Sequence, residues 1–147
     1  MKLVNDVAAG ALSATAAFQL GTVGAITTDR YTRAIAPLKP KQAGILLVLS
    51  LFEGMSQQDL ARKMGVAPSL LVGLLDELQD MGAVRRERDE HDRRRQIVVL
   101  TEAGRELYGT CAAAAKAMDE ELLKDVADPE AFRAGLRQIA AGMGLPV

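Results

Sequence analysis

With 147 residues, the chain has the length of one ordinary domain with a substantial core, and it is too short for two independent domains. Hydrophobic residues make up 49% and charged residues 25%, which excludes intrinsic disorder and the fibrous classes. The formal net charge of −1 gives no sign of a polyanion partner, and the single cysteine, Cys111, leaves no intrachain disulfide framework or multi-cysteine zinc site and agrees with a reducing cytoplasm.

The first predicted element is an uncharged stretch, Val7–Thr28, whose 22 residues equal the length of a membrane span. Most of these residues are small or weakly polar, so insertion into a bilayer would gain little free energy. We therefore expect no membrane role but a soluble helix packed on a partner helix, with Leu12 and Phe18 at the contact. The segment Gly21–Gly24 is expected to break the helix or to lie at a close contact, and not to bind a nucleotide.

The next two elements are predicted helices. Apolar residues recur at helical spacing over Leu38–Phe52, and Gly54 ends that helix. A capping box follows, because the Ser56 hydroxyl can accept from the Asp59 amide while the Asp59 carboxylate reaches back. The sequence therefore predicts a short helix over Gln57–Met64.

A second short helix starts at Pro68, because proline lacks only the amide hydrogen that a first-turn residue does not need. Gly82 ends this helix. Its broad apolar face consists of leucines: Leu70, Leu71, Leu74, Leu75 and Leu78. Two short helices joined by the turn at residues 65–67 make a helix-turn-helix pattern.

A β-hairpin is predicted next, with strands over Ala83–Arg88 and Arg94–Leu100. The eleven residues from Arg85 to Arg95 hold six arginines, four carboxylates and the chain's one histidine. A two-stranded hairpin is marginal alone, so it should lie against the helices. The candidates for its packed side are Val84, Ile97 and Val99.

Two further helices complete the chain. Thr101 caps the first, and Asp128-Pro129 starts the last. The first carries an apolar stripe: Ala103, Leu107, Cys111, Ala114 or Ala115, Met118 and Leu122. The last carries Phe132, Leu136, Ile139 and Met143 on one face. The central unit cannot cover both stripes, so a dimer is expected to cover them.

At this point the sequence resembles the MarR family of winged-helix transcription regulators. The likeness lies in Leu38 and Gln42, in "SQQDLARKMGVAPSLL" and in "LLDELQDMGAVRRERDEHDRRRQIVVLTEAG". Its most specific part is the pattern Asp89-x-x-Asp92-x-Arg94, followed at a fixed distance by the segment 100–104. The strong resemblance covers residues 38–107, about half of the chain, and the ends match only in helical character.

The resemblance implies a mainly α fold with a small β-hairpin wing. It divides the chain into an N-terminal dimerisation region (1–36), a winged helix-turn-helix DNA-binding domain (37–101) and C-terminal dimerisation helices (102–147). It further implies a cytoplasmic homodimer that binds near-palindromic double-stranded DNA, commonly as a repressor released by a small effector. Dimerisation is expected at Leu12, Phe18, Met118, Leu122, Phe132, Leu136 and Ile139, and an effector crevice at Phe18, Tyr31 and Tyr108.

The wing needs arginines of two kinds. Some must reach phosphates or the minor groove, and others must hold the loop in shape, where Asp89 and Asp92 can accept from the Arg94 guanidinium. The alternative is a solvated hairpin with surface ion pairs. The expected DNA contacts are Gln57, Pro68, Ser69, Leu70, Val72, Gly73, Arg88, His91, Arg93, Arg94 and Arg95.

The recognition helix departs from the usual family pattern. Leu70, Val72 and Gly73 stand where many relatives carry polar or basic readers, and Asp76 and Glu77 would repel phosphate unless they are turned away or paired. Two explanations stay open: recognition relies on the wing, thymine methyl groups and DNA shape, or DNA binding is weak or lost. The second leaves a winged-helix module for protein interaction or ligand binding.

The sequence offers little for other chemistry. Cys111 is expected to be an inert, packed residue, with a redox switch as the alternative. His91 has no metal-ligand partners at convincing spacing, so no metal or cofactor is expected. Serine nucleophile elbows, phosphate loops and metalloprotease signatures are absent from the sequence, so we do not expect an enzyme.

Overall fold

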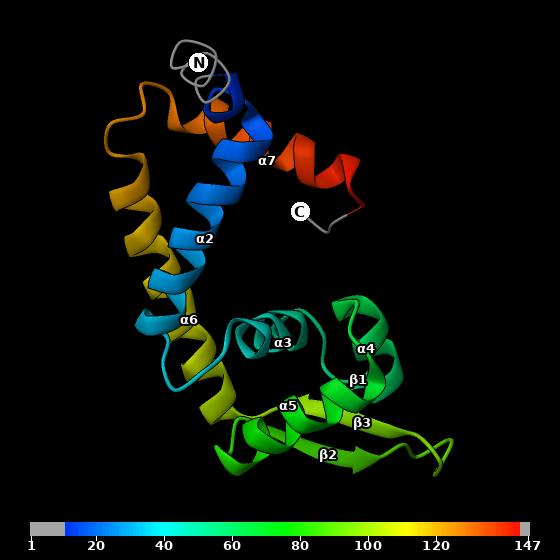
Figure 1. The fold of residues 1–147 in the computed structure, drawn as a ribbon. Helices are drawn as coiled ribbons and strands as arrows, with labels where there is room; N and C mark the ends of the chain where they lie inside the picture. The colour runs from blue at the N-terminus through cyan, green and yellow to red at the C-terminus, as the bar shows by residue number, and fades with distance from the viewer. Residues whose placement is uncertain (1–10, 145–147) are drawn as a thin grey trace. The chain divides into compact units, whose positions relative to one another are not determined.

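The computed structural model describes residues 11–144, and it confirms a mainly helical chain with a small antiparallel sheet (Figure 1). The elements in chain order are α2 (Ala16–Ala34), α3 (Pro40–Ser50), β1 (Met55–Ser56), α4 (Gln57–Met64), α5 (Pro68–Asp80), β2 (Val84–Arg88), β3 (Gln96–Leu100), α6 (Glu102–Leu123) and α7 (Pro129–Gly142). The chain divides into two compact units, one ending at Ala114 and the other beginning at Ala115.

The core of the first unit lies between α3, α4, α5 and the sheet. It is built largely of fully buried aliphatic side chains: Ile45, Leu46, Leu49, Leu60, Leu71, Leu75, Leu78, Val84 and Val98. α3 and α4 contact β3, while α5 contacts β2 (Figure 1). The buried leucines of α4 and α5 recur at helical spacing, so the helix-turn-helix pattern of the sequence predicted this packing.

The sheet has three strands in the order β1-β3-β2, and the short strand β1 escaped the sequence analysis. The register pairs Val84 with Leu100 and Arg86 with Val98, so these four residues face the helices. The prediction for Val84 is confirmed. The prediction for Ile97 and Val99 is wrong, because Val98 and Leu100 are buried whereas Ile97 and Val99 are only half-buried. A strand alternates its faces residue by residue, so a shift of one position reverses the assignment.

The start of α6 is fixed against the sheet. Thr101 Oγ1 donates to the Gly82 carbonyl at 2.6 Å and accepts from the Gly104 amide at 3.0 Å, which confirms Thr101 as a cap. The sequence analysis placed Ala103 on the inner apolar stripe of this helix, but Gly104 is the buried residue of the turn and Ala103 is exposed. A Cβ on Gly104 would lie 2.1 Å from the Ala83 carbonyl oxygen, so α6 approaches the sheet too closely for any side chain.

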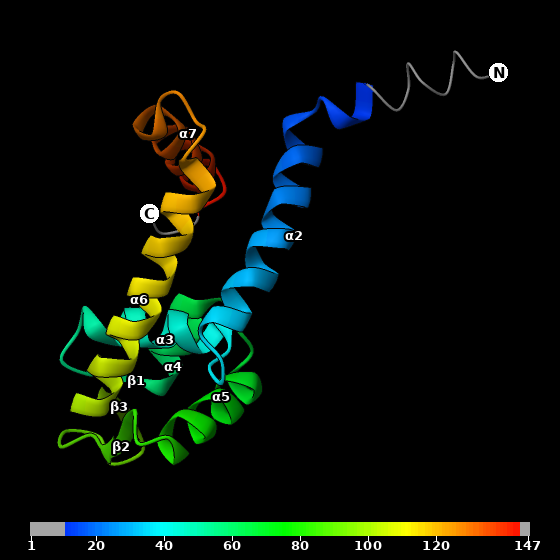
Figure 2. The same cartoon turned by 90° about the vertical axis from the view of Figure 1, so that its left-hand side faces the viewer.

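α2 is one unbroken helix, as Figure 2 shows, and the predicted break at Gly21–Gly24 is wrong. A Cβ on either glycine would meet nothing within 4 Å. Within residues 11–144, no helix is both long enough and apolar enough to cross a membrane. Residues 7–10 of the uncharged stretch lie outside the described part of the chain.

In the second unit, Arg133 of α7 donates to Asp119 of α6 through Nε at 3.1 Å and through Nη2 at 2.6 Å. Asp128 caps α7 by accepting from the Ala131 amide at 2.9 Å, which confirms the predicted start of that helix. α7 has no buried residue among those described.

Candidate nucleic-acid interface

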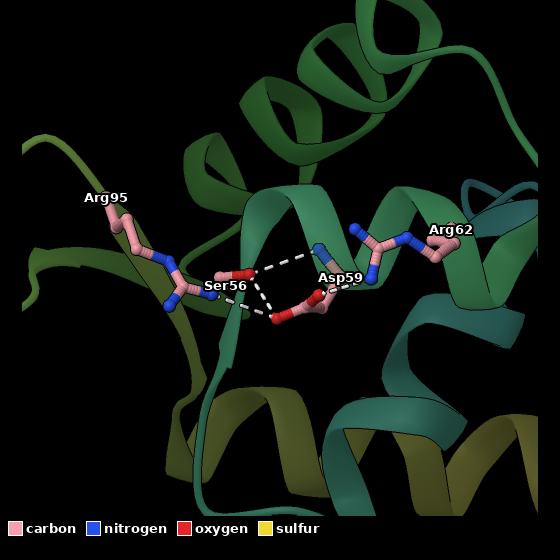
Figure 3. A network of polar contacts seen from close by, with 4 residues as sticks. All are labelled: Ser56, Asp59, Arg62 and Arg95. Atoms are coloured by element: carbon pink, nitrogen blue, oxygen red, sulfur yellow. Dashed lines mark hydrogen bonds and ion pairs between the residues drawn. The ribbon is translucent and has the colours of Figure 1, made fainter.

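The N-terminus of α4 carries the predicted Ser56 cap, but the predicted capping box is only half formed, because the Asp59 carboxylate accepts from the Ser56 hydroxyl and not from its amide. Ser56 Oγ accepts from the Asp59 amide at 3.1 Å and donates to Asp59 Oδ2 at 2.6 Å (Figure 3). Asp59 also accepts from Arg62 and from Arg95. The Ser56 hydroxyl, with Arg62 and Arg95 beside it, holds the pKa of the Asp59 carboxyl below its ordinary value. The carboxylate is therefore ionised at neutral pH and available as an anchor.

Arg95 connects the wing to this anchor. Its Nη2 lies 3.1 Å from Asp59 Oδ2, across 36 residues of sequence (Figure 3). The sequence grouped Arg95 with the DNA-facing cations, whereas the structure gives its guanidinium a carboxylate partner on α4. Arg95 therefore fixes where the wing begins, and nearly half of its side chain remains accessible.

The wing loop is braced by backbone amides. Asp89 Oδ1 accepts from the amides of His91 at 2.8 Å and Asp92 at 3.4 Å, and Asp92 Oδ1 accepts from the Arg94 amide at 3.0 Å. The His91 amide, more than that of Asp92, holds the pKa of the Asp89 carboxyl below its ordinary value. The sequence assigned this bracing to the Arg94 guanidinium, but a short aspartate side chain reaches the amide two residues ahead more readily.

This bracing leaves three guanidinium groups unoccupied. Arg88, Arg93 and Arg94 are exposed, and in the part of the chain that the structure describes their side chains form no hydrogen bond or ion pair. They lie at the loop end of the hairpin, together with the exposed His91. The wing therefore presents three guanidinium groups that have no ion-pair partner in the described chain, on a loop that its own carboxylates hold in shape.

Arg86 is a positioning residue that the sequence analysis missed. Its Nη1 donates to Asp76 Oδ1 at 2.7 Å and to Gln79 Oε1 at 3.4 Å, and its Nη2 donates to the Val72 carbonyl at 3.3 Å. Its side chain is only 18% exposed. Arg86 therefore ties β2 to α5 and sets the wing against the recognition helix. Arg86 pairs with the buried Val98, and this pairing places Arg86 on the side of the sheet that faces the helices. The sequence alone does not reveal this strand register.

The two carboxylates of α5 are both neutralised within the chain. Asp76 pairs with Arg86, and Glu77 accepts from Lys39 Nζ at 2.7 and 2.8 Å and from the buried Gln42 Nε2 at 2.6 Å. The Lys39 ammonium is the main cause that holds the pKa of Glu77 below its ordinary value. The repulsion of phosphate that the sequence suggested is thus offset by intramolecular partners.

The outward side of α5 begins with the exposed residues Pro68, Ser69, Leu70, Val72 and Gly73. The sequence analysis counted Leu70 on the apolar inner face, but its side chain is 44% exposed, and that of Val72 is 40% exposed. Both residues therefore stand on the surface of the recognition helix, as expected for the predicted DNA contacts.

A polar cavity of about 160 Å³ lies where the wing meets the start of α4. It is lined by Ser56, Gln57, Gln58, Arg94, Arg95 and Gln96. Gln57 is half-buried, and its Oε1 has no hydrogen-bond partner among the described residues. Of the two guanidinium groups at this cavity, Arg95 is paired with Asp59, and Arg94 is the one that can favour an anionic oxygen there.

The residues predicted for dimerisation are mostly exposed on their own units. Leu12 and Phe18 are exposed in the first unit, and Met118 is half-buried in the second. The other four predicted positions are exposed: Leu122, Phe132, Leu136 and Ile139.

The predicted effector residues are not all brought together. Tyr31 and Tyr108 pack against the core cluster, whereas Phe18 lies 13 residues before Tyr31 on the same helix, a distance of about 20 Å along its axis. The Tyr31 hydroxyl donates to the Cys111 carbonyl at 3.5 Å.

Cys111 is 2% exposed, and burial raises the pKa of its thiol. The described residues hold no group of three or more His, Cys, Asp or Glu side chains that could bind a metal ion.

A helix-turn-helix followed by an arginine-bearing wing, with the wing fixed to both of its helices, defines a winged helix-turn-helix protein. The family model described as "MarR family" matches residues 36–95. An HTH-type transcriptional repressor of Mycobacterium bovis is 30% identical over 132 residues, which cover 88% of this chain and 90% of that protein. The chain belongs to the MarR family, and it is a DNA-binding transcriptional regulator.

Other relatives are similar over different spans. An uncharacterised HTH-type regulator of Bacillus subtilis is 37% identical over 67 residues, which cover 46% of this chain and 42% of that one. The structure of CouR from Rhodococcus jostii bound to p-coumaroyl-CoA has a TM-score of 0.78 and 29% identity, and covers 92% of this chain and 96% of that one. The structure of CouR bound to a 23-mer DNA duplex has a TM-score of 0.79 and 27% identity, and the match covers 90% of this chain and 94% of that one.

Proposed function

We propose that the protein is a repressor that binds a near-palindromic DNA site as a homodimer. Each subunit places α5 in the major groove and its wing in the adjacent minor groove. The observation that carries the proposal is the set of three unoccupied guanidinium groups, Arg88, Arg93 and Arg94, at the end of a braced wing. The repressor among the relatives and the DNA-bound CouR support it.

The distribution of charge supports DNA binding although the net charge is −1. Arg95 and Arg86 are engaged with carboxylates, so they contribute little free charge to a partner. Arg93 and Arg94 have no such partner in the described chain, and a narrow minor groove concentrates the negative potential that attracts arginine. Affinity should therefore depend strongly on salt, through release of counterions from the phosphates.

The experiment is a titration of fluorescent duplex DNA at several salt concentrations with the full-length protein and two variants. Arg93→Ala and Arg94→Ala should each weaken binding and reduce the slope of log K against log salt by about 0.9 for every phosphate that is no longer neutralised. Arg33→Ala is the matched control, because it removes the same charge from α2, where Arg33 pairs with Asp29.

Affinity that is indifferent to both wing variants would remove the wing from the mechanism. Failure to bind even nonspecific duplex at low salt would instead favour a winged-helix module for protein interaction or ligand binding.

Dimerisation is proposed through the helices at the two ends of the chain. Phe132, Leu136 and Ile139 are exposed and recur at helical spacing along α7, and Phe18 is exposed on α2; an apolar helix face is normally buried against another element. Leu136→Asp should shift the protein toward monomer in analytical ultracentrifugation, whereas Arg137→Asp, beside it on the same helix, should not. A monomeric unmodified protein would contradict the dimer.

Release by a small-molecule effector is the last part of the proposal. The CouR structure bound to p-coumaroyl-CoA supports it, and Tyr31 and Tyr108 are the candidate lining residues that lie near the DNA-binding core. Acyl-CoA thioesters titrated into the protein–DNA complex should lower the fraction of bound duplex. A complex that is unaffected by every thioester tried would contradict this class of effector.

A further inference from the structure

The first two turns of α5 present hydrocarbon, not polar groups, on their outward side. Leu70 is 44% exposed and Val72 is 40% exposed, while Leu71 and Leu75 on the core-facing side are fully buried. Ser69 supplies the one hydroxyl group on these two turns. Leu70 and Val72 therefore do not serve the core, and their apolar surface is available to a partner.

The polar side chains farther along α5 are already engaged. Asp76 pairs with Arg86 at 2.7 Å, Gln79 accepts from the same arginine, and Glu77 is held by Lys39 and Gln42. Asp76 and Glu77 cannot reach a base edge without leaving their cationic partners, and Gln79 is engaged through its carbonyl oxygen. Of the features that base pairs present in the major groove, the apolar one is the 5-methyl group of thymine.

Gly73 gives an independent indication. On a helix of 3.6 residues per turn it lies between Leu70 and Val72, and a Cβ there would meet nothing within 4 Å. No neighbour within the described chain requires a glycine, although glycine destabilises a helix interior relative to alanine. A glycine on an exposed helix face suits the close approach of another surface.

We propose that α5 recognises thymine through its 5-methyl groups, with Leu70 and Val72 as the contacts and Gly73 as the point of closest approach. This inference rests on the proposed binding of duplex DNA. It makes Leu70 and Val72 specificity-determining residues, while the wing arginines supply affinity that does not depend on sequence.

The first test compares thymine with deoxyuridine. Duplexes selected from a random library by the full-length protein are resynthesised with deoxyuridine in place of thymine, which removes only the methyl groups. Affinity should fall about three- to fourfold for each methyl group that α5 would otherwise cover, the ratio that corresponds to burying one hydrocarbon group. The Leu70→Ala/Val72→Ala variant should bind the thymine duplex more weakly and should not distinguish the two duplexes.

The second test uses Gly73→Ala, for which the inference predicts opposite effects on folding and binding. The variant should unfold at a higher temperature than the unmodified protein, because alanine favours the helix, and yet it should bind the selected duplex more weakly. Gly109→Ala in α6 is the matched control, because a Cβ there also meets nothing within 4 Å. It should raise the unfolding temperature and leave DNA affinity unchanged.

Equal affinity for the thymine and deoxyuridine duplexes would overturn the inference, and so would a deoxyuridine effect that persists in the double variant. In both cases salt-dependent binding would leave the proposed function standing. Absence of binding to any duplex at low salt would overturn both.

Discussion

Gly104→Ala is expected to destabilise the protein through the contact between α6 and the sheet. The new Cβ would lie 2.1 Å from the Ala83 carbonyl oxygen and 2.6 Å from Leu100 Cδ1. Ala83 is fully buried, and its oxygen already accepts from the Thr101 amide at 3.1 Å. The backbone of α6 must therefore move away from β2, and it weakens that hydrogen bond as it moves.

The magnitude follows from three contributions. Overpacking a well-packed site costs about 1–3 kcal/mol, and the weakened hydrogen bond costs about 0.5–1.5 kcal/mol. The better helix propensity of alanine offsets up to about 1 kcal/mol. The net loss of unfolding free energy is about 0.5–4.5 kcal/mol, and Gly109→Ala in the same helix should instead gain about 0.5–1 kcal/mol.

The assay is urea unfolding of the unmodified protein and both variants at one protein concentration, because dimerisation makes apparent stability depend on concentration. The midpoint for Gly104→Ala should fall and that for Gly109→Ala should rise. A Gly104→Ala variant at least as stable as the unmodified protein would refute the argument, since it would show that α6 does not approach Ala83 this closely.

Three further predictions concern single side chains. Arg86→Met should lower the unfolding free energy by about 1–2 kcal/mol in the same urea titration. This is near the lower end for hydrogen bonds to charged groups, because Asp76 is 56% exposed. The control Arg85→Met removes only the exposed pair with Glu87 and should change the unfolding free energy by less than about 1 kcal/mol. The folded pKa of Asp59 is depressed, so its contribution to stability is present above the unfolded pKa of about 3.9 and is lost as the pH falls through the folded pKa. Asp59→Asn should therefore flatten the acid limb of a stability–pH profile below about pH 4. An unchanged acid limb would contradict the stabilising role of the Asp59 carboxylate. Burial and a raised pKa should keep the Cys111 thiol unreactive in the native state, so treatment with peroxide should leave DNA affinity unchanged. A fall in affinity that the Cys111→Ser variant prevents would instead reveal a redox switch.

The sequence by itself determined the features that depend on neighbouring residues. Ser56 predicted the start of α4, Pro68 and Asp128 predicted where α5 and α7 begin, and Thr101 predicted the start of α6. Each of these signals acts within one turn of helix, where the chain geometry leaves few alternatives. The order of predicted helices and hairpin, together with the resemblance to the MarR family, was likewise sufficient to predict the fold class.

Only the tertiary structure decided which arginines are engaged within the chain and which are left without an intramolecular partner. Arg86 meets Asp76 and Arg95 meets Asp59 across 10 and 36 residues, and nothing in the run of six arginines distinguishes these two from Arg93 or Arg94. The distinction comes from the strand register, which turns Arg86 toward α5, and from the packing that brings the wing beside α4. Register depends on contacts between distant segments, so local periodicity misassigned Ile97 and Val99 for the same reason.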